Sequence, residues 1–197
     1  MIQLPEKLSI LKEEGNKLTL ELSPLYPGYG VTLGNTLRRV LLSSIEGASI
    51  TTVKIKGVSH EFSTIEGVLE NVIEIIMNIK KIRLKLFGDE PATLELKTSG
   101  EKKVKAEDIK TNPNVEIVNK DQLIATLTSK KAELEVELTV EKGIGYVPIE
   151  QRQKEKISVG TIAIDALFSP VKNANFTVDN IRVGQRTDYN KLIFEIE

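Results

Sequence analysis

The chain has 197 residues, 40% hydrophobic and 28% charged, with a formal net charge of −1 and no cysteine, which suits one large globular domain or two small ones. These values exclude disulfides, thiolate nucleophiles and cysteine-ligated metals, and they make the chain by itself a poor binder of nucleic acid. No apolar run approaches the ~20 residues that span a membrane, and the first residues lack the pattern of a secretory signal, so the cytoplasm is the expected location.

The first 50 residues are expected to form a strand, a turn and a helix. Alternation of polar and apolar residues over 17–22 predicts a strand that Pro24 ends. The turn-prone residues 27–30 follow. An amphipathic helix is then expected to begin with Thr32 as its N-cap and to stop near residues 46–47.

This helix has two faces at about 100° per residue. The broad apolar face comprises Leu33, Leu37, Val40, Leu41, Ser44 and Ile45, while Leu42 lies on the far side between Arg38 and Arg39. Of 27 basic residues 21 are lysine, so only six are arginine, and two of these six are adjacent here. Because guanidinium groups are favoured at protein interfaces, the pair indicates a partner-binding face. The alternative is an ordinary surface helix with solvated arginines.

A second helix is expected to begin at residues 63–66, because Ser63 and Glu66 have the spacing of a capping box. Its wide apolar face would cover a sheet and comprises Ile65, Val68, Leu69, Val72, Ile73, Ile75, Ile76 and Ile79.

Strands are expected on both sides of that helix. Residues 49–56 form an extended segment with Val53 and Ile55 on one side. Period-two patterns follow, separated by turn signals, at residues 82–86, 92–96, 115–117 and 134–140. Further extended segments are expected at 157–165, 176–183 and 192–196, after a charged stretch at 150–156. The chain is thus expected to be α+β, with a discontinuous first domain into which a β-rich domain is inserted.

The residues offer no credible catalytic set. Gly28 to Gly34 precede a helix and could cradle a phosphate, but their spacing fits neither dinucleotide nor P-loop motifs, and turn glycines explain them better. The one histidine, His60, fits an ordinary imidazole better than a metal ligand or catalytic base. No metal and no cofactor are expected.

Four long segments resemble the amino-terminal domain of the bacterial-type RNA polymerase alpha subunit family. They occur in the family's order, at residues 34–44 (GNTLRRVLLSS), 57–68 (GVSHEFSTIEGV), 143–148 (GIGYVP) and 183–192 (VGQRTDYNKL). The resemblance implies a homodimer on which the large beta and beta-prime subunits assemble, and catalysis that belongs to those subunits. It also implies a dimerisation subdomain from residues 1–47 and 173–197, with residues 48–172 inserted as a β-rich subdomain that contacts the large subunits.

The resemblance assigns roles to particular residues. Residues expected at the beta subunit are Arg38, Arg39, Leu42, His60, Glu61, Ser63 and Thr64. Those expected at beta-prime are Lys80, Ile164 and Asp165. Those expected at the dimer interface are Leu33, Leu37, Val40 and Leu41.

Family members continue into another dimerisation helix, a linker and a DNA-binding domain, whereas this sequence ends at Glu197, so no direct DNA contact and no membrane contact are expected from it. The expected location is the bacterial cytoplasm, with a plastid as the alternative. Two rival functions stay open: a free-standing nucleotide- or anion-binding enzyme that uses Gly28 to Gly34, and a structural homodimer of unrelated function.

Overall fold

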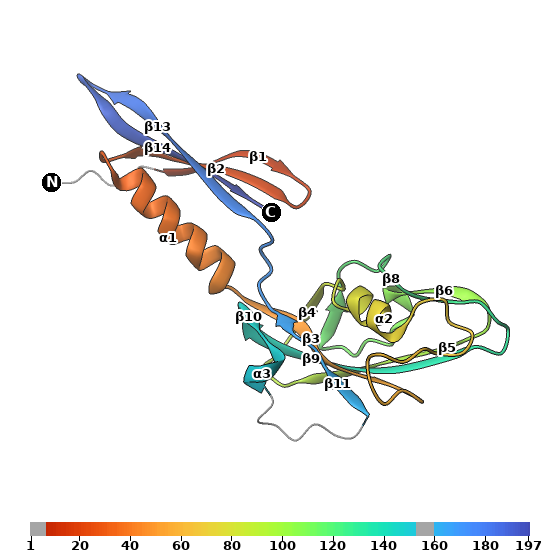
Figure 1. Ribbon diagram of the computed structural model, residues 1–197. Coiled ribbons are helices and arrows are strands. Elements are labelled where there is room, and N and C mark those ends of the chain that lie inside the picture. Colours follow the sequence, from red (N-terminus) through yellow and green to blue (C-terminus); the bar gives the residue numbers. More distant parts are fainter. Residues whose placement is uncertain (1–6, 153–159) are drawn as a thin grey trace. The chain divides into compact units, whose positions relative to one another are not determined.

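The computed structural model describes residues 7–152 and 160–197, which form an α+β protein made mostly of strands (Figure 1). The chain divides into two compact units. Unit 1 comprises Met1–Ile45 and Ser169–Glu197, and unit 2 comprises Glu46–Phe168. The expected boundaries differ from these by two to four residues. The end of the predicted charged stretch, 153–156, and the start of the next extended segment, 157–159, lie outside the described residues.

Unit 1 is a four-stranded antiparallel sheet with one helix. The strand order is β1-β2-β14-β13, with β1 at Lys7–Glu14, β2 at Lys17–Leu25, β13 at Ala174–Val183 and β14 at Arg186–Ile196. The sequence patterns correctly indicate β13 and β14 but miss β1, whose pairing with β2 shifts register between Ile10 and Lys12 and so breaks the alternation.

The prediction that Pro24 ends β2 is wrong, because the strand continues to Leu25. Pairing with β1 extends no further than Ser23, and pairing with β14 shifts register between Asn190 and Leu192. Pro24 therefore lies at a ladder irregularity, where its missing N–H costs no regular hydrogen bond.

Helix α1 (Tyr29–Ser43) lies along β13 and β14 in unit 1 (Figure 1). Gly28, at φ 84°, occupies the N-cap position. The prediction of Thr32 as N-cap is wrong, because Thr32 lies inside the helix and its hydroxyl donates to the Gly28 carbonyl at 3.4 Å. The helix also ends earlier than expected, since β3 begins at Glu46.

Unit 2 is built on a six-stranded sheet whose path is β5-β9-β3-β4-β7, with β11 also paired to β3. Its strands are β3 (Glu46–Ile55), β4 (Leu84–Leu86), β5 (Ala92–Ser99), β7 (Val115–Ile117), β9 (Glu133–Ile144) and β11 (Thr161–Ala163). There are also two antiparallel two-stranded sheets. One pairs β6 (Lys102–Lys105) with β8 (Leu123–Leu127), and the other pairs β10 (Tyr146–Val147) with β12 (Ala166–Leu167). A 3-10 turn, η1 (Ala106–Asp108), and the short α3 (Ile149–Arg152) complete the unit.

The period-two patterns of unit 2 are confirmed, and their apolar residues form one core. Leu94, Leu96, Leu134, Val136, Leu138 and Val140 are all buried there, together with Val53 and Ile55 of β3. Unit 1 has a smaller core around Leu25, Leu192 and Phe194, to which Leu33 and Leu41 of α1 add.

The predicted start of the second helix is wrong. Helix α2 spans only Val72–Ile79, and its capping box is formed by Asn71 and Glu74, at 2.8 and 3.0 Å. The residues before it instead run beside β8: the Leu69 amide donates to the Thr126 carbonyl, and the Glu70 carboxylate accepts from the Thr126 amide and hydroxyl. The expected burial holds for Val72, Ile75, Ile76 and Ile79, but it is wrong for Leu69 and Ile73, which are 72% and 37% exposed.

Candidate protein-interaction surfaces

Helix α1 packs on the sheet through glycines. A Cβ atom added to Gly30 would lie 2.6 Å from Val178 Cγ1, and one added to Gly34 would lie 2.5 Å from the Phe176 ring. Both glycines are buried. Their lack of a side chain lets the helix approach the sheet closely, while Leu33 and Leu41 pack against the core of unit 1 beside them.

The start of α1 is capped by a side chain from β14. Asn190 Oδ1 accepts from the amides of Gly28 at 2.9 Å and Gly30 at 3.3 Å, while its Nδ2 donates to Asn180 Oδ1 at 3.1 Å. These are the amides that an anion would need in a phosphate loop, and here a buried carboxamide already occupies them. Turn geometry explains Gly28, but Gly30 and Gly34 serve helix packing rather than a turn.

The face of α1 that turns away from the sheet carries the two arginines. Arg38 and Arg39 are exposed, and neither guanidinium forms an ion pair with any residue that the structure describes. Leu42 is 38% exposed between them, and Val31 is 53% exposed. Val31 lies seven residues before Arg38 and so shares this face, an exposed apolar side chain that the sequence reasoning passed over.

The four residues expected at a dimer interface divide into two pairs. Leu33 and Leu41 are half-buried against the core of unit 1. Leu37 and Val40 remain exposed, at 41% and 48%. On the core-side face of the sheet, Leu8 and Ile10 of β1 are also exposed, as cross-strand neighbours of Leu22 and Leu20. Sequence reasoning missed this second apolar area together with the strand that carries it.

In unit 2, His60, Glu61, Ser63 and Thr64 lie in one irregular segment between β3 and α2. The Ser63 hydroxyl donates to the His60 carbonyl and so shapes the turn. Phe62, inside the same segment, is 77% exposed. No helix begins at Ser63, and the segment is a loop with an exposed aromatic side chain.

Lys80 and Asp165, 85 residues apart in sequence, meet in unit 2. Lys80 Nζ lies 3.4 Å from Asp165 Oδ2, and Asp165 Oδ1 accepts from the Ile149 amide at 3.2 Å. Partial burial alone would raise the pKa of Asp165, but the Ile149 hydrogen bond and the Lys80 charge outweigh it and hold that pKa below its usual value. Ile164 points the other way, into the core, and is only 4% exposed.

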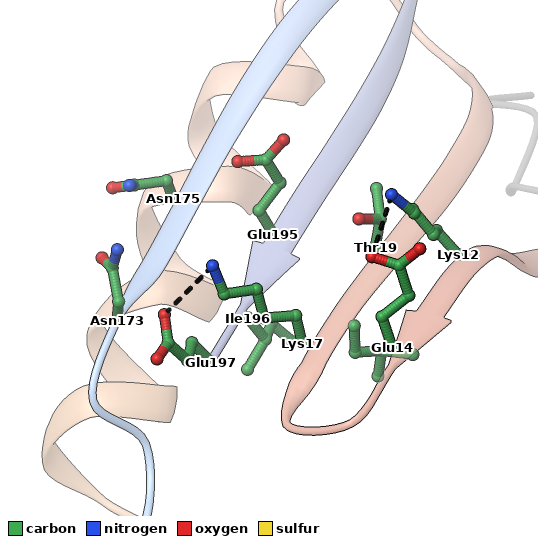
Figure 2. Close-up of a pocket in the computed structure, with 10 residues that line it drawn as sticks. Lys12, Glu14, Lys17, Thr19, Asn173, Asn175, Glu195, Ile196 and Glu197 are labelled. Carbon is green, nitrogen blue, oxygen red and sulfur yellow. Dashed lines mark ion pairs between the residues drawn. The ribbon is translucent and has the colours of Figure 1, made fainter.

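Figure 2 shows a pocket of about 330 Å³ on the sheet face of unit 1 that turns away from α1. Lys12, Thr19, Glu195 and Asn175 are successive cross-strand neighbours along its floor. Lys12 pairs with Glu14 at 3.0 Å, and Lys17 lies 3.9 Å from Glu197. Both lysines of the pocket thus have a carboxylate beside them, as is expected on a solvated sheet face.

Neither a candidate metal site nor a candidate membrane-spanning helix occurs among the described residues. Residues 7–152 and 160–197 contain no group of three or more histidine, cysteine, aspartate or glutamate side chains placed to hold a metal ion. Among the helices of those same stretches, none combines the length and the apolar character that crossing a membrane requires.

Exposed arginines that lie beside exposed apolar side chains on one helix face are typical of a surface that contacts another protein. The family profile described as "RNA polymerase Rpb3/RpoA insert domain" matches residues 53–169. The DNA-directed RNA polymerase subunit alpha of Geobacter metallireducens is 56% identical over 88% of this chain and 51% of its own length. The subunits alpha of Moorella thermoacetica and Aquifex aeolicus are 53% and 51% identical, over 88% and 98% of this chain and 55% and 61% of their own lengths.

The chain therefore belongs to the family of DNA-directed RNA polymerase alpha subunits. It spans 51–61% of the length of these curated relatives. The matched insert profile falls almost entirely within unit 2, between residues 46 and 168.

Proposed function

We propose that the chain is the assembly scaffold of a bacterial RNA polymerase, a homodimer on which the beta and beta-prime subunits come together. In this proposal the chain supplies no catalytic residue, and nucleotidyl transfer belongs to the large subunits. Unit 1 is the dimerisation subdomain, and unit 2 is the inserted subdomain that contacts the large subunits. The complex works in the cytoplasm.

The observation that carries the proposal is the outward face of α1. Arg38 and Arg39 bracket Leu42 there, without an ion-pair partner among the described residues. Two nearby positive charges repel each other weakly in water, and an exposed leucine side chain gains free energy when it is removed from water. A partner that presents carboxylates around an apolar side chain would satisfy all three groups at once. We assign this face to the beta subunit, together with the loop of His60, Glu61, Ser63 and Thr64.

The dimer contact is assigned to the apolar side chains that unit 1 leaves uncovered. Leu37 and Val40 on α1 have the exposure that such a contact needs. Leu33 and Leu41 pack against the chain's own sheet and support the helix from beneath. A two-fold dimer would present the same surfaces twice, so each of the two different large subunits would use one copy.

Lys80 and Asp165 are assigned to the beta-prime subunit. Their ion pair is partly exposed, with 38% and 31% of the two side chains accessible. Because Ile164 is buried, its part in this contact is to hold Asp165 in place from the core side.

Mass measurement by light scattering tests the proposal. The full-length subunit alone should have the mass of a dimer, and addition of purified beta should give a complex of one beta per dimer. A monomeric subunit that does not bind beta would contradict the scaffold function. A dimeric subunit that does not bind beta would favour a structural homodimer of unrelated function.

A further inference from the structure

Residues 56–71, which connect β3 to α2, form neither a helix nor a regular strand, and we call them the loop segment. The loop segment carries the four residues of unit 2 that the proposed function assigns to the beta subunit: His60, Glu61, Ser63 and Thr64. Loops are more mobile than the elements they connect, and a mobile surface loses affinity because binding has to order it. The contacts that hold the loop segment in one conformation therefore bear directly on its ability to bind.

The second half of the loop segment pairs with β8 and the residue that follows it. The Thr128 amide donates to the Gly67 carbonyl at 2.8 Å, and the Leu69 amide donates to the Thr126 carbonyl at 2.9 Å. The residues between these two pairs form a single antiparallel bridge. In an antiparallel ladder every second residue exchanges two hydrogen bonds with the residue opposite. The next bond of this ladder would join the Thr126 amide to the Leu69 carbonyl.

The Glu70 side chain takes the place of that carbonyl. One oxygen of its carboxylate accepts from the Thr126 amide at 2.6 Å, and the other accepts from the Thr126 hydroxyl at 2.9 Å. Hydrogen bonds to an ionised acceptor are shorter and stronger than those between neutral groups. The ladder thus ends on a charge-assisted bond at the point where the chain turns into α2, because the next residue, Asn71, is the N-cap of that helix.

The middle of the loop segment is fitted to unit 2 from beneath. Gly67 has a φ of 76°, and a Cβ added to it would lie 2.8 Å from the Cβ of Ala132, so both its conformation and its surroundings require glycine. Ile65 and Val68 on either side pack against the core. Glu70 supplies the hold at the polar edge, where no apolar contact is available to do so.

Hydrogen bonds carry this hold back to the residues assigned to beta. The amide of Val72, the first residue of α2, donates to the Ser63 carbonyl at 3.2 Å, and the Ser63 hydroxyl donates to the His60 carbonyl. The start of α2 is thus tied to Ser63 on one side and lies two residues after Glu70 on the other. Because the Glu70 carboxylate is occupied by Thr126, its influence on His60 and Ser63 passes through the backbone.

We infer that Glu70 is a positioning residue, whose bonds to Thr126 hold the loop segment in its binding conformation before the beta subunit arrives. A surface that is ordered in advance loses less conformational entropy on binding, which raises affinity without any additional contact. The inference rests on the proposed function, in which the loop segment contacts beta. It extends that function to a side chain that acts within the subunit itself.

The test compares variants of the full-length subunit in their affinity for purified beta. Glu70→Ala removes both acceptors, whereas Thr126→Val removes only the hydroxyl bond and keeps the shape of the side chain. Glu66→Ala is the matched control, because Glu66 is exposed in the same loop segment and forms no side-chain hydrogen bond or ion pair with the described residues. We expect Glu70→Ala to weaken beta binding by about tenfold, Thr126→Val by about threefold, and Glu66→Ala by less than about twofold.

Two further measurements separate positioning from a general loss of stability. Glu70→Gln keeps a carbonyl oxygen for the Thr126 amide and an amino group that can donate to the hydroxyl, so it should restore beta binding to within about threefold of wild type. In the free subunit, Glu70→Ala should speed amide hydrogen exchange in the loop segment by about tenfold, while exchange in β9, whose Leu134 and Leu138 lie in the core, stays as in wild type. If Glu70→Ala does not fold, Thr126→Val carries the same comparison.

The inference fails in three cases. If Arg39→Ala weakens beta binding while Glu70→Ala and Thr126→Val bind as wild type does, Glu70 positions nothing that beta uses, and the scaffold function stands. If exchange in β9 rises together with exchange in the loop segment, Glu70 serves the stability of unit 2 as a whole. If the wild-type subunit does not bind beta, the proposed function is wrong and the inference is wrong with it.

Discussion

Replacement of Gly34 by alanine tests whether the close approach of α1 to its sheet is what positions the helix. The new Cβ would lie 2.5, 2.6 and 2.8 Å from Phe176 Cδ2, Cε2 and Cγ, far inside the ~3.5–4.0 Å of an ordinary carbon contact. Phe176 cannot turn away freely, because its ring stacks on that of Phe194 at 5.9 Å. Either the helix shifts or the aromatic pair rearranges.

The expected magnitude is a balance of two effects. Overpacking of this kind costs about 1–3 kcal/mol, while alanine in place of glycine inside a helix contributes up to about 1 kcal/mol. We therefore expect Gly34→Ala to lower the free energy of unfolding by about 1 kcal/mol. In a Phe176→Ala background, which removes Cγ, Cδ2 and Cε2 and with them the clash, the same substitution should instead stabilise the protein.

Urea unfolding of the full-length subunit, followed by circular dichroism, measures the change in unfolding free energy that Gly34→Ala causes in each background. Asn35→Ala is the control within the same helix, since Asn35 is exposed, and it should stabilise the protein by a few tenths of a kcal/mol. If Gly34→Ala stabilises the wild-type protein as Asn35→Ala does, the argument that glycine is needed for close packing is refuted.

Two further predictions concern polar contacts. Asn190→Ala removes the acceptor that caps α1 and should lower the free energy of unfolding by urea by about 1–2 kcal/mol. Asn190→Asp keeps an acceptor and should lower it less. Equal losses of unfolding free energy in the two variants would contradict the capping role. Partial burial would raise the pKa of Asp108, but hydrogen bonds from Lys102 Nζ at 2.7 Å and the Lys105 amide at 2.9 Å outweigh it and lower that pKa. The stabilising contribution of Asp108 is therefore complete above the ordinary aspartate pKa of about 4, and it is lost as the pH falls through the lower pKa of the folded state. Lys102→Met should reduce the dependence of the unfolding free energy on pH between about pH 5 and 2. An unchanged pH profile would exclude the Lys102–Asp108 pair as the source of that dependence.

The sequence predicts most strands because apolar and polar residues alternate along a strand that has one buried face. Residues 92–96 and 134–140 follow that rule closely, and both lie in strands with alternate residues buried. The pattern fails for β1, where a register shift breaks the alternation and both Leu8 and Ile10 remain exposed.

The helix starts show why local signals can mislead. Ser63 and Glu66 satisfy a capping box in sequence, but Gly67 adopts φ 76° and the segment pairs with β8, a contact distant in sequence. The cap of α1 is likewise supplied by Asn190, 162 residues after Gly28. Long-range partners of this kind leave no local pattern.

The candidate site also has one part that the sequence predicts and another part that it does not. Helical periodicity correctly places Leu42 between Arg38 and Arg39 on a face that turns out to be exposed. It cannot show that Lys80 meets Asp165, and the family resemblance, which groups Ile164 with Asp165, does not show that the two side chains point in opposite directions. The roles of these residues toward the large subunits stay predictions.

In the proposed function, the arginine face of α1 binds the beta subunit. The most direct measurement of this contact is the affinity of the full-length subunit for purified beta, compared between wild type, Arg39→Ala and Arg182→Ala, with the dimer dissociation constant measured in parallel. Arg182 is also an exposed arginine of unit 1, and its Nε donates to its own hairpin at Gly184. We expect Arg39→Ala to weaken beta binding by about 2 kcal/mol or more, while dimerisation is unchanged and Arg182→Ala binds beta as wild type does. Equal beta binding by Arg39→Ala and wild type would contradict this expectation.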